Sequence, residues 1–174
     1  MPDRETLRKL DKETLIDLLE DAAKNWLAHD GLWFQAVEGH YGLERAIELD
    51  TEVWERFTVI EAKRIMKRHN IGEGGGLDAL QMALDLRLYA LINVQKILRI
   101  DENTLRFEMV DCRVQAARRR KGLPDFPCKS VGLVEYEGFA KTIDPRIRTR
   151  CIACPPDPHP EEFWCAWEFT IADP

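Results

Sequence analysis

The sequence predicts an α+β fold, in which an N-terminal helical layer packs on a small C-terminal antiparallel sheet. Two observations support this prediction. Apolar residues recur at helical spacing through most of the first hundred residues. Later in the chain, segments 104–115 and 147–171 alternate apolar and polar side chains, as half-buried strands do. The 174 residues suit one domain, 1–174, with a helical half (1–100) and a cysteine-rich β half (101–174).

The first long helices are predicted at 11–27 and 50–69, from the spacing of their apolar residues. Asp11 and Asp50 precede these segments and are expected to be their N-caps. Glu61 falls inside the apolar stripe of the second helix, where a carboxylate must pair, reach solvent or serve a site. Two shorter helical patterns lie between the long ones, at 32–41 and 43–49.

The segment Leu77–Leu98 is apolar on nearly all sides and is predicted to form a single central core helix, about 33 Å long. A glycine-rich break at 70–76 separates it from the preceding helix. A half-buried strand is predicted at 104–115, and a further helix at 130–143, after a proline-bracketed loop that carries Cys128.

The last two β-segments are predicted to pair as an antiparallel hairpin around a proline-rich loop at 155–161. Counting outward from this loop places Cys151 opposite Cys165 and Arg148 opposite Glu168. The thiols then lie on the inner face of the hairpin, and an ion pair lies on its outer face.

The formal net charge of −6 disfavours non-specific nucleic-acid binding. Residues 106–150 nevertheless carry eleven basic side chains against six acidic ones, which suits a small anionic ligand as well as a solvated surface. No stretch approaches the roughly 18 apolar residues of a membrane span. The charged N-terminus also lacks a secretion signal, so a cytoplasmic protein is expected.

All five cysteines follow residue 111, and their odd number argues against a fully paired disulfide framework. Thiolates suit a tetrahedral zinc ion or an iron–sulfur cluster, so both cofactors stay open. Ordinary core thiols and a redox or nucleophilic thiol are the alternatives. The candidate metal ligands are Cys112, Cys128, Cys151, Cys154 and Cys165.

Basic and amide side chains would gather on the outer face of the sheet if segment 104–115 lies beside the hairpin. Arginine forks bind carboxylate or phosphate, and an adjacent glutamate can transfer a proton. Glu168 and Glu61 are therefore the candidate general bases. A surface ladder of ion pairs is the alternative reading. The candidate ligand-binding residues are Arg113, Gln115, Lys129, Arg148 and Arg150.

Four motifs carry a resemblance to a known family: CRVQ at 112–115, FPCK at 126–129, CIACPPD at 151–157 and WCAWEF at 164–169. With them, the chain resembles an uncharacterised prokaryotic family of cytosolic proteins. It is more distantly similar to the 2-aminothiazoline-4-carboxylate hydrolase-like proteins. That similarity implies a cytosolic α+β fold and hydrolysis of a small cyclic C–N bond, and it identifies no catalytic residues.

The leading functional hypothesis is a small-ligand or metal-binding cytosolic protein whose site lies on the cysteine- and arginine-bearing sheet. A hydrolase acting on a small carboxylate-bearing amide-like or amidine-like substrate is the second hypothesis. A structural protein or homo-oligomer with inert thiols is the third. The residues leave open whether the protein is an enzyme.

Overall fold

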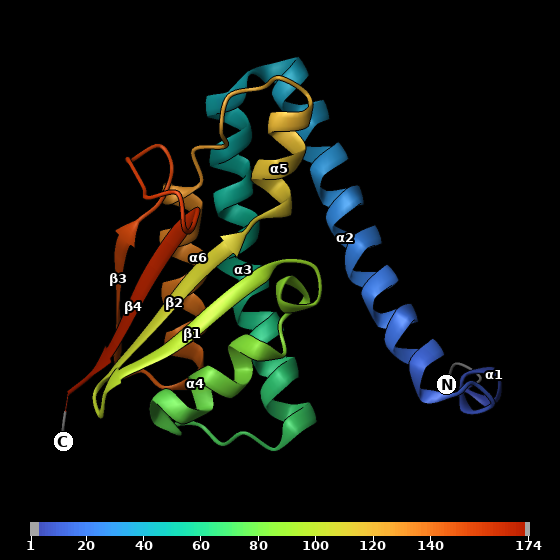
Figure 1. Cartoon of the computed structure of the whole chain (residues 1–174), viewed down its shortest axis with the longest axis vertical. Helices are drawn as coiled ribbons and strands as arrows, with labels where there is room; N and C mark the ends of the chain where they lie inside the picture. The colour runs from blue at the N-terminus through green and yellow to red at the C-terminus, as the bar shows by residue number, and fades with distance from the viewer. Residues whose placement is uncertain (1–3, 173–174) are drawn as a thin grey trace.

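The structure is a computed structural model that describes residues 4–172. It confirms the α+β prediction: helices fill the N-terminal part and an antiparallel sheet lies in the C-terminal part (Figure 1). The elements are α1 (Glu5–Arg8), α2 (Lys12–Tyr41), α3 (Leu43–His69), α4 (Gly76–Asp85), the 3₁₀ turn η1 (Leu88–Leu91), β1 (Val94–Asp101), β2 (Thr104–Asp111), α5 (Arg113–Arg120), α6 (Lys129–Ile143), β3 (Ile147–Ala153) and β4 (Cys165–Ile171).

The sheet has the strand order β1-β2-β4-β3, with every neighbouring pair antiparallel. Helix α6 packs against its inner face and α3 lies behind α6, so the core has three layers (Figure 1). The inward positions of the central strands, among them Phe107 and Trp167, meet Tyr136 and Phe139 of α6. Helix α2 leaves this core and extends away from it toward the N-terminus (Figure 1).

The predicted central helix Leu77–Leu98 is wrong. The segment forms α4, then η1, and then enters the edge strand β1. Its first part buries Leu80 and Leu84 completely, as the prediction requires. The helix ends near Arg87, whose ψ of 155° is extended. The segment is apolar on all sides because three elements each bury a different face, and periodicity alone does not separate this case from one buried helix.

The two long helices, α2 and α3, are separated by Gly42, where the chain turns. Its φ of 84° is left-handed, so α2 ends there and α3 starts at the next residue. Asp11 is confirmed as an N-cap, because its carboxylate accepts a hydrogen bond from the Thr14 amide at 2.9 Å. The N-cap prediction for Asp50 is wrong: Asp50 lies within α3, and its side chain is left for another role.

The hairpin prediction is confirmed for β3 and β4, but its register is wrong by two residues. Cys151 lies opposite Trp167 rather than Cys165, and Arg150 rather than Arg148 lies opposite Glu168. The connection spans 154–164, which is longer than the predicted loop, and this moves the pairing along the strand.

The predicted strand 104–115 ends early, because β2 stops at Asp111 and α5 follows at once. Arg113 and Gln115 therefore leave the sheet, and the predicted outer face shared with Arg148 and Arg150 does not form. The helix predicted at 130–143 is confirmed as α6.

Candidate functional site

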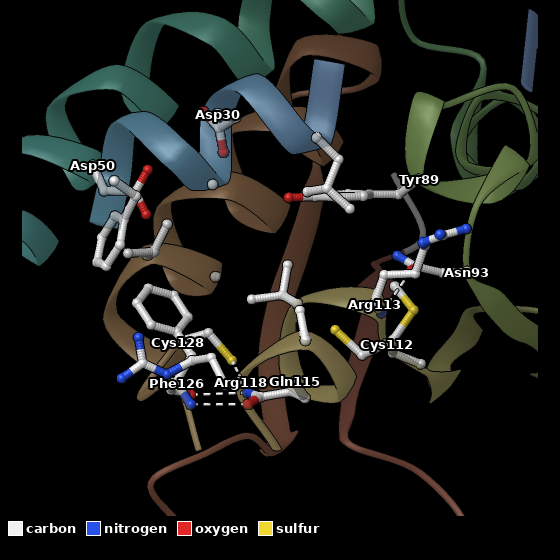
Figure 2. A pocket seen from close by; sticks show the side chains of 18 of the residues that line it. Asp30, Asp50, Tyr89, Asn93, Cys112, Arg113, Gln115, Arg118, Phe126 and Cys128 are labelled. Atoms are coloured by element: carbon white, nitrogen blue, oxygen red, sulfur yellow. Dashed lines mark hydrogen bonds between the residues drawn. The ribbon is translucent and has the colours of Figure 1, made fainter. Parts of the chain in front are cut away.

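A cavity of about 470 Å³ lies where α2, α3, α5 and α6 meet the end of the sheet (Figure 2). Apolar and aromatic side chains make up most of its lining, as in other small-molecule sites, and charged side chains of both signs complete it. Its size also falls within the roughly 300–1,000 Å³ of such sites. The apolar and aromatic side chains of the lining include Phe34, Trp54, Tyr89, Phe126, Val131 and Trp167.

Helix α5 forms one wall of the cavity, and two buried polar side chains fix its position. The Gln115 amide donates to the Phe126 carbonyl at 2.9 Å and accepts from the Phe126 amide at 2.8 Å. Arg118 forms a two-pronged ion pair with Glu38 of α2, at 3.0 and 3.2 Å, and also donates to the Pro124 carbonyl. The wall therefore depends on α2 and on the loop before α6.

The opposite wall carries carboxylates. Asp30 of α2 and Asp50 of α3 lie on the side that these two helices form, across from Gln115 and Cys128 (Figure 2). Burial raises the pKa of Asp50 to about 7, and the nearby charges of Asp30 and Glu135 add to the shift. Burial also raises the pKa of Asp30. These helices were predicted in outline, but periodicity does not reveal which polar residue faces a cavity.

Glu61, a predicted general base, does not line the cavity and belongs to a buried ion-pair cluster. Its carboxylate accepts from Arg87 Nε at 2.8 Å and from the Leu88 amide at 3.3 Å. The same guanidinium forms an ion pair with Glu135 at 2.7 Å and lies over the Phe139 ring. Both Glu61 oxygens are thus engaged, and the pairing alternative from the sequence is the one observed.

Four of the five thiols line the cavity floor; Cys151 does not. The Sγ atoms of Cys128 and Cys154 lie 3.6 Å apart, and the hydrogen bond between them lowers the pKa of Cys128. Cys154 also has a hydrogen-bond contact with Cys165, and burial raises the pKa of Cys112 to about 12. Within residues 4–172, no three or more His, Cys, Asp or Glu side chains are arranged to hold a metal ion.

The predicted ligand-binding residues divide into two groups. Arg113 and Gln115 line the cavity, whereas the others lie outside its lining. Arg150 is paired with Glu168 at 2.7 Å on the exposed side of the hairpin. Lys129 forms an ion pair with Asp157. Arg148 is exposed on β3.

The fold and the cavity define the class: an α+β protein with a cavity between its helices and the end of its sheet. The chain belongs to the family described as "Family of unknown function (DUF6125)", whose model matches residues 8–171. This agrees with the expected uncharacterised family; the similarity to aminothiazoline-carboxylate hydrolases stays a prediction. No curated protein matches the chain.

Among solved structures, the chain is similar to the phenol-responsive sensory domain of the transcription activator PoxR, solved with phenol. The TM-score is 0.56 at 18% sequence identity, and the match covers 83% of this chain and 73% of that one. At this identity the likeness concerns the fold. As for membranes, the helices within residues 4–172 include none that is both long and apolar enough to cross a bilayer.

Proposed function

We propose that the protein binds a small, largely apolar molecule in the cavity between α2, α5 and α6. The observation that carries the proposal is the cavity itself, about 470 Å³ lined mainly by apolar and aromatic side chains. A ligand that covers apolar surface of this extent gains hydrophobic and packing contacts. The structural likeness to a sensory domain solved with phenol supports the same kind of ligand.

The test is ligand-induced stabilisation, because a molecule that binds only the folded chain raises its melting temperature. Phenol, indole and benzyl alcohol are the probes, each added up to its solubility limit. We expect at least one of them to raise the melting temperature of the wild-type chain. If none of the three does so, the proposal is wrong.

A cavity-filling variant locates the effect. Val131 of α6 is 4% exposed and lines the cavity, whereas Leu133 on the same helix is exposed and does not line it. Val131→Phe should abolish the stabilisation by the probes, and Leu133→Phe should preserve it. Val114→Phe on α5 fills the cavity from the other wall and serves as the second variant if Val131→Phe fails to fold. If the probes raise the melting temperature of both cavity variants as much as that of the wild-type chain, they bind outside the cavity.

Metal binding by the thiols is a second candidate, favoured by the contact between Cys128 and Cys154. Two thiolates on one tetrahedral zinc lie about 3.8 Å apart when each Zn–S bond is about 2.3 Å. The observed separation of 3.6 Å is close to this, and Cys165 lies next to Cys154. A complete site needs further ligands, and the nearby Cys112 and Cys151 are the predicted ones.

Metal analysis combined with thiol titration tests this candidate. Stoichiometric zinc or iron in protein purified without chelator, together with thiols protected from a titrating reagent, would support it. Metal-free protein in which all five thiols titrate would contradict it. The ligand-binding proposal does not depend on this result.

The other hypotheses from the sequence stay predictions. For the hydrolase, Glu61 and Glu168 lie outside the cavity lining and each is in an ion pair. For an anionic ligand, Arg113 is an exposed cation of the cavity lining. For self-association, α2 exposes apolar side chains, Leu19 and Trp33 among them, and light scattering after size-exclusion chromatography would measure the subunit number.

A further inference from the structure

The cavity contains two carboxylates that differ from the other half-buried or buried carboxylates of the protein. Glu38, Glu61 and Glu135 each have an arginine partner. Asp30 and Asp50 form no ion pair with any Lys or Arg within the described residues. The charge of the adjacent, exposed His29 partly offsets the raised pKa of Asp30. Asp50 has a hydrogen bond with the Trp54 side chain.

Two like charges that share a partly buried space repel each other, and burial disfavours the charged form of each. Lys24 also lines the cavity, but its ammonium is 3.2 Å from Glu20 and 3.6 Å from Asp21. The wall formed by Asp30 and Asp50 is therefore negative, whereas the remaining cations of the lining, Arg113 and Arg120 among them, belong to α5 and to the residue that follows it. A cation brought by the ligand is the simplest partner for that wall.

A second observation points to a ligand at the same place. Trp167 is fully buried and lines the cavity. Its indole Nε1 has no hydrogen-bond partner within residues 4–172. Buried polar groups are rarely left unpaired, so this N–H is a candidate donor to a polar atom of a ligand.

The aromatic lining also suits a cation. Trp54 and Tyr89 stack with ring centroids 5.8 Å apart, and both line the cavity beside the carboxylates. Aromatic faces attract ammonium groups, more strongly where water is excluded. In this protein the Arg87 guanidinium already lies over both rings, 5.8 Å from the Trp54 centroid and 5.6 Å from the Tyr89 centroid.

We propose that the ligand is an aromatic or similarly apolar amine whose protonated nitrogen binds between Asp30 and Asp50. The proposal rests on the function proposed above and specifies the polar end of the ligand. The apolar body then occupies the space against Val131 and Trp167. A neutral phenol-like molecule would donate a hydrogen bond to one carboxylate at most and would supply no counter-charge.

The test compares three probes of nearly equal shape in neutral buffer: benzylamine, benzyl alcohol and benzoate. Dissociation constants are measured by calorimetry on the full chain. We expect benzylamine to bind about tenfold more tightly than benzyl alcohol, and benzoate to bind most weakly. Equal or tighter binding of benzyl alcohol or benzoate would overturn the amine assignment and leave the cavity proposal intact. Binding by none of the three would also overturn the amine assignment, and the melting experiments with phenol and indole would then decide the cavity proposal.

Charge-removing variants assign the effect to the two residues. Asp30→Asn and Asp50→Asn should each weaken benzylamine binding about tenfold and leave benzyl alcohol binding nearly unchanged. Asp17→Asn is the matched control, because Asp17 is an exposed carboxylate of α2 outside the cavity lining. An equal loss of benzylamine affinity in Asp17→Asn would mean that net charge alone is responsible, which would contradict the proposal.

Discussion

Arg87 is 3% exposed and holds together three segments of the chain. Its guanidinium forms ion pairs with Glu61 of α3 and Glu135 of α6. Arg87 itself lies between α4 and η1. Removal of one member of a buried ion-pair cluster leaves the others charged and unpaired in a poorly hydrated environment. The position of Arg87 thus fixes how α3, α6 and the start of the sheet meet.

Replacement of this guanidinium should be severely destabilising. We expect Arg87→Met to lower the free energy of unfolding by about 3–5 kcal/mol, because Glu61 and Glu135 lose their counter-charge. Arg150→Met, which removes a surface ion pair, should cost less than about 1 kcal/mol. Urea denaturation of the three proteins measures both values. Equal effects in the two variants would show that the buried cluster contributes no more than a surface pair.

The pairing of Glu61 was predictable as one of three alternatives, because a carboxylate in an apolar stripe needs compensation. Its partner was not predictable. Arg87 was placed in the middle of the expected helix Leu77–Leu98, which would have pointed its side chain elsewhere. Asp50 shows the same limit: as an expected N-cap its carboxylate would have bonded to the backbone, whereas within α3 it faces the cavity.

The raised pKa of Asp50 has a consequence for stability. The folded chain binds a proton at Asp50 more tightly than the unfolded chain, whose carboxyl has the usual pKa of 3.8. Stability should therefore fall as the pH rises from that value through about 7. Asp50→Asn should remove part of this fall; Asp30 and Glu135, whose pKa values are also raised, should keep the remainder.

Urea denaturation at about pH 5 and about pH 8 measures this pH dependence. Asp17→Asn is again the control, since its exposed carboxylate should leave the wild-type dependence unchanged. If Asp50→Asn also kept the full wild-type dependence, Asp50 would be a solvated carboxylate and the negative wall of the cavity would be contradicted.

At the scale of elements, α6 lies close to the sheet because it has a glycine where Trp167 approaches. A Cβ atom at Gly132 would lie 2.7 Å from Cζ2 of Trp167, which is fully buried. By propensity alone this glycine disfavours the helix 130–143, since glycine lowers helix stability. It is instead the contact that allows the two layers to pack, and single-chain propensity does not contain that information.

Gly132→Ala should therefore destabilise the protein by about 1–3 kcal/mol, because Trp167 or α6 must shift. Gly39→Ala in α2 is the matched control: a Cβ there meets nothing within 4 Å. That change should stabilise the protein by about 0.5–1 kcal/mol through the better helix propensity of alanine. Changes of opposite sign in the free energy of unfolding, measured by urea denaturation, support the close packing, whereas stabilisation by both substitutions would contradict it.

The strands were predictable from alternation, but their registers and ends were not. Alternation correctly indicated β2 as well as both hairpin strands. The position of Glu168 opposite Arg150 depends on where the loop 154–164 ends, and proline-rich loops of this length have no fixed geometry. The edge strand β1 was missed because it follows α4 after only a short 3₁₀ turn and continues the same apolar run.

At the scale of the whole molecule, the cavity forms only when both halves of the chain come together. Asp30 and Asp50 come from the helical half, and Cys128 and Trp167 come from the β half. A site on the C-terminal sheet was expected from the clustered thiols and arginines. The thiol part of that expectation lies at the cavity floor, whereas most of the arginines lie outside it, because β2 ends before Arg113.

Because both halves of the chain line the cavity, sequence patterns identified only the lining residues from the C-terminal half. Motifs report residues that are close in the chain, and the cavity joins α2 to the floor of the sheet across more than a hundred residues. The contact between Phe34 and Phe126, with ring centroids 5.1 Å apart, is one such junction. Whether the chain folds as one domain stays a prediction, and a single cooperative unfolding transition would support it.

The most direct measurement of the central claim is a crystal structure of the chain with 4-bromobenzyl alcohol, whose bromine is located by its anomalous scattering. We expect a bromine peak inside the cavity, with the ring between Val131 and Trp167 and with α2 and α5 in place around it. A bromine peak only outside the cavity, or a cavity filled by the protein's own side chains, would contradict it.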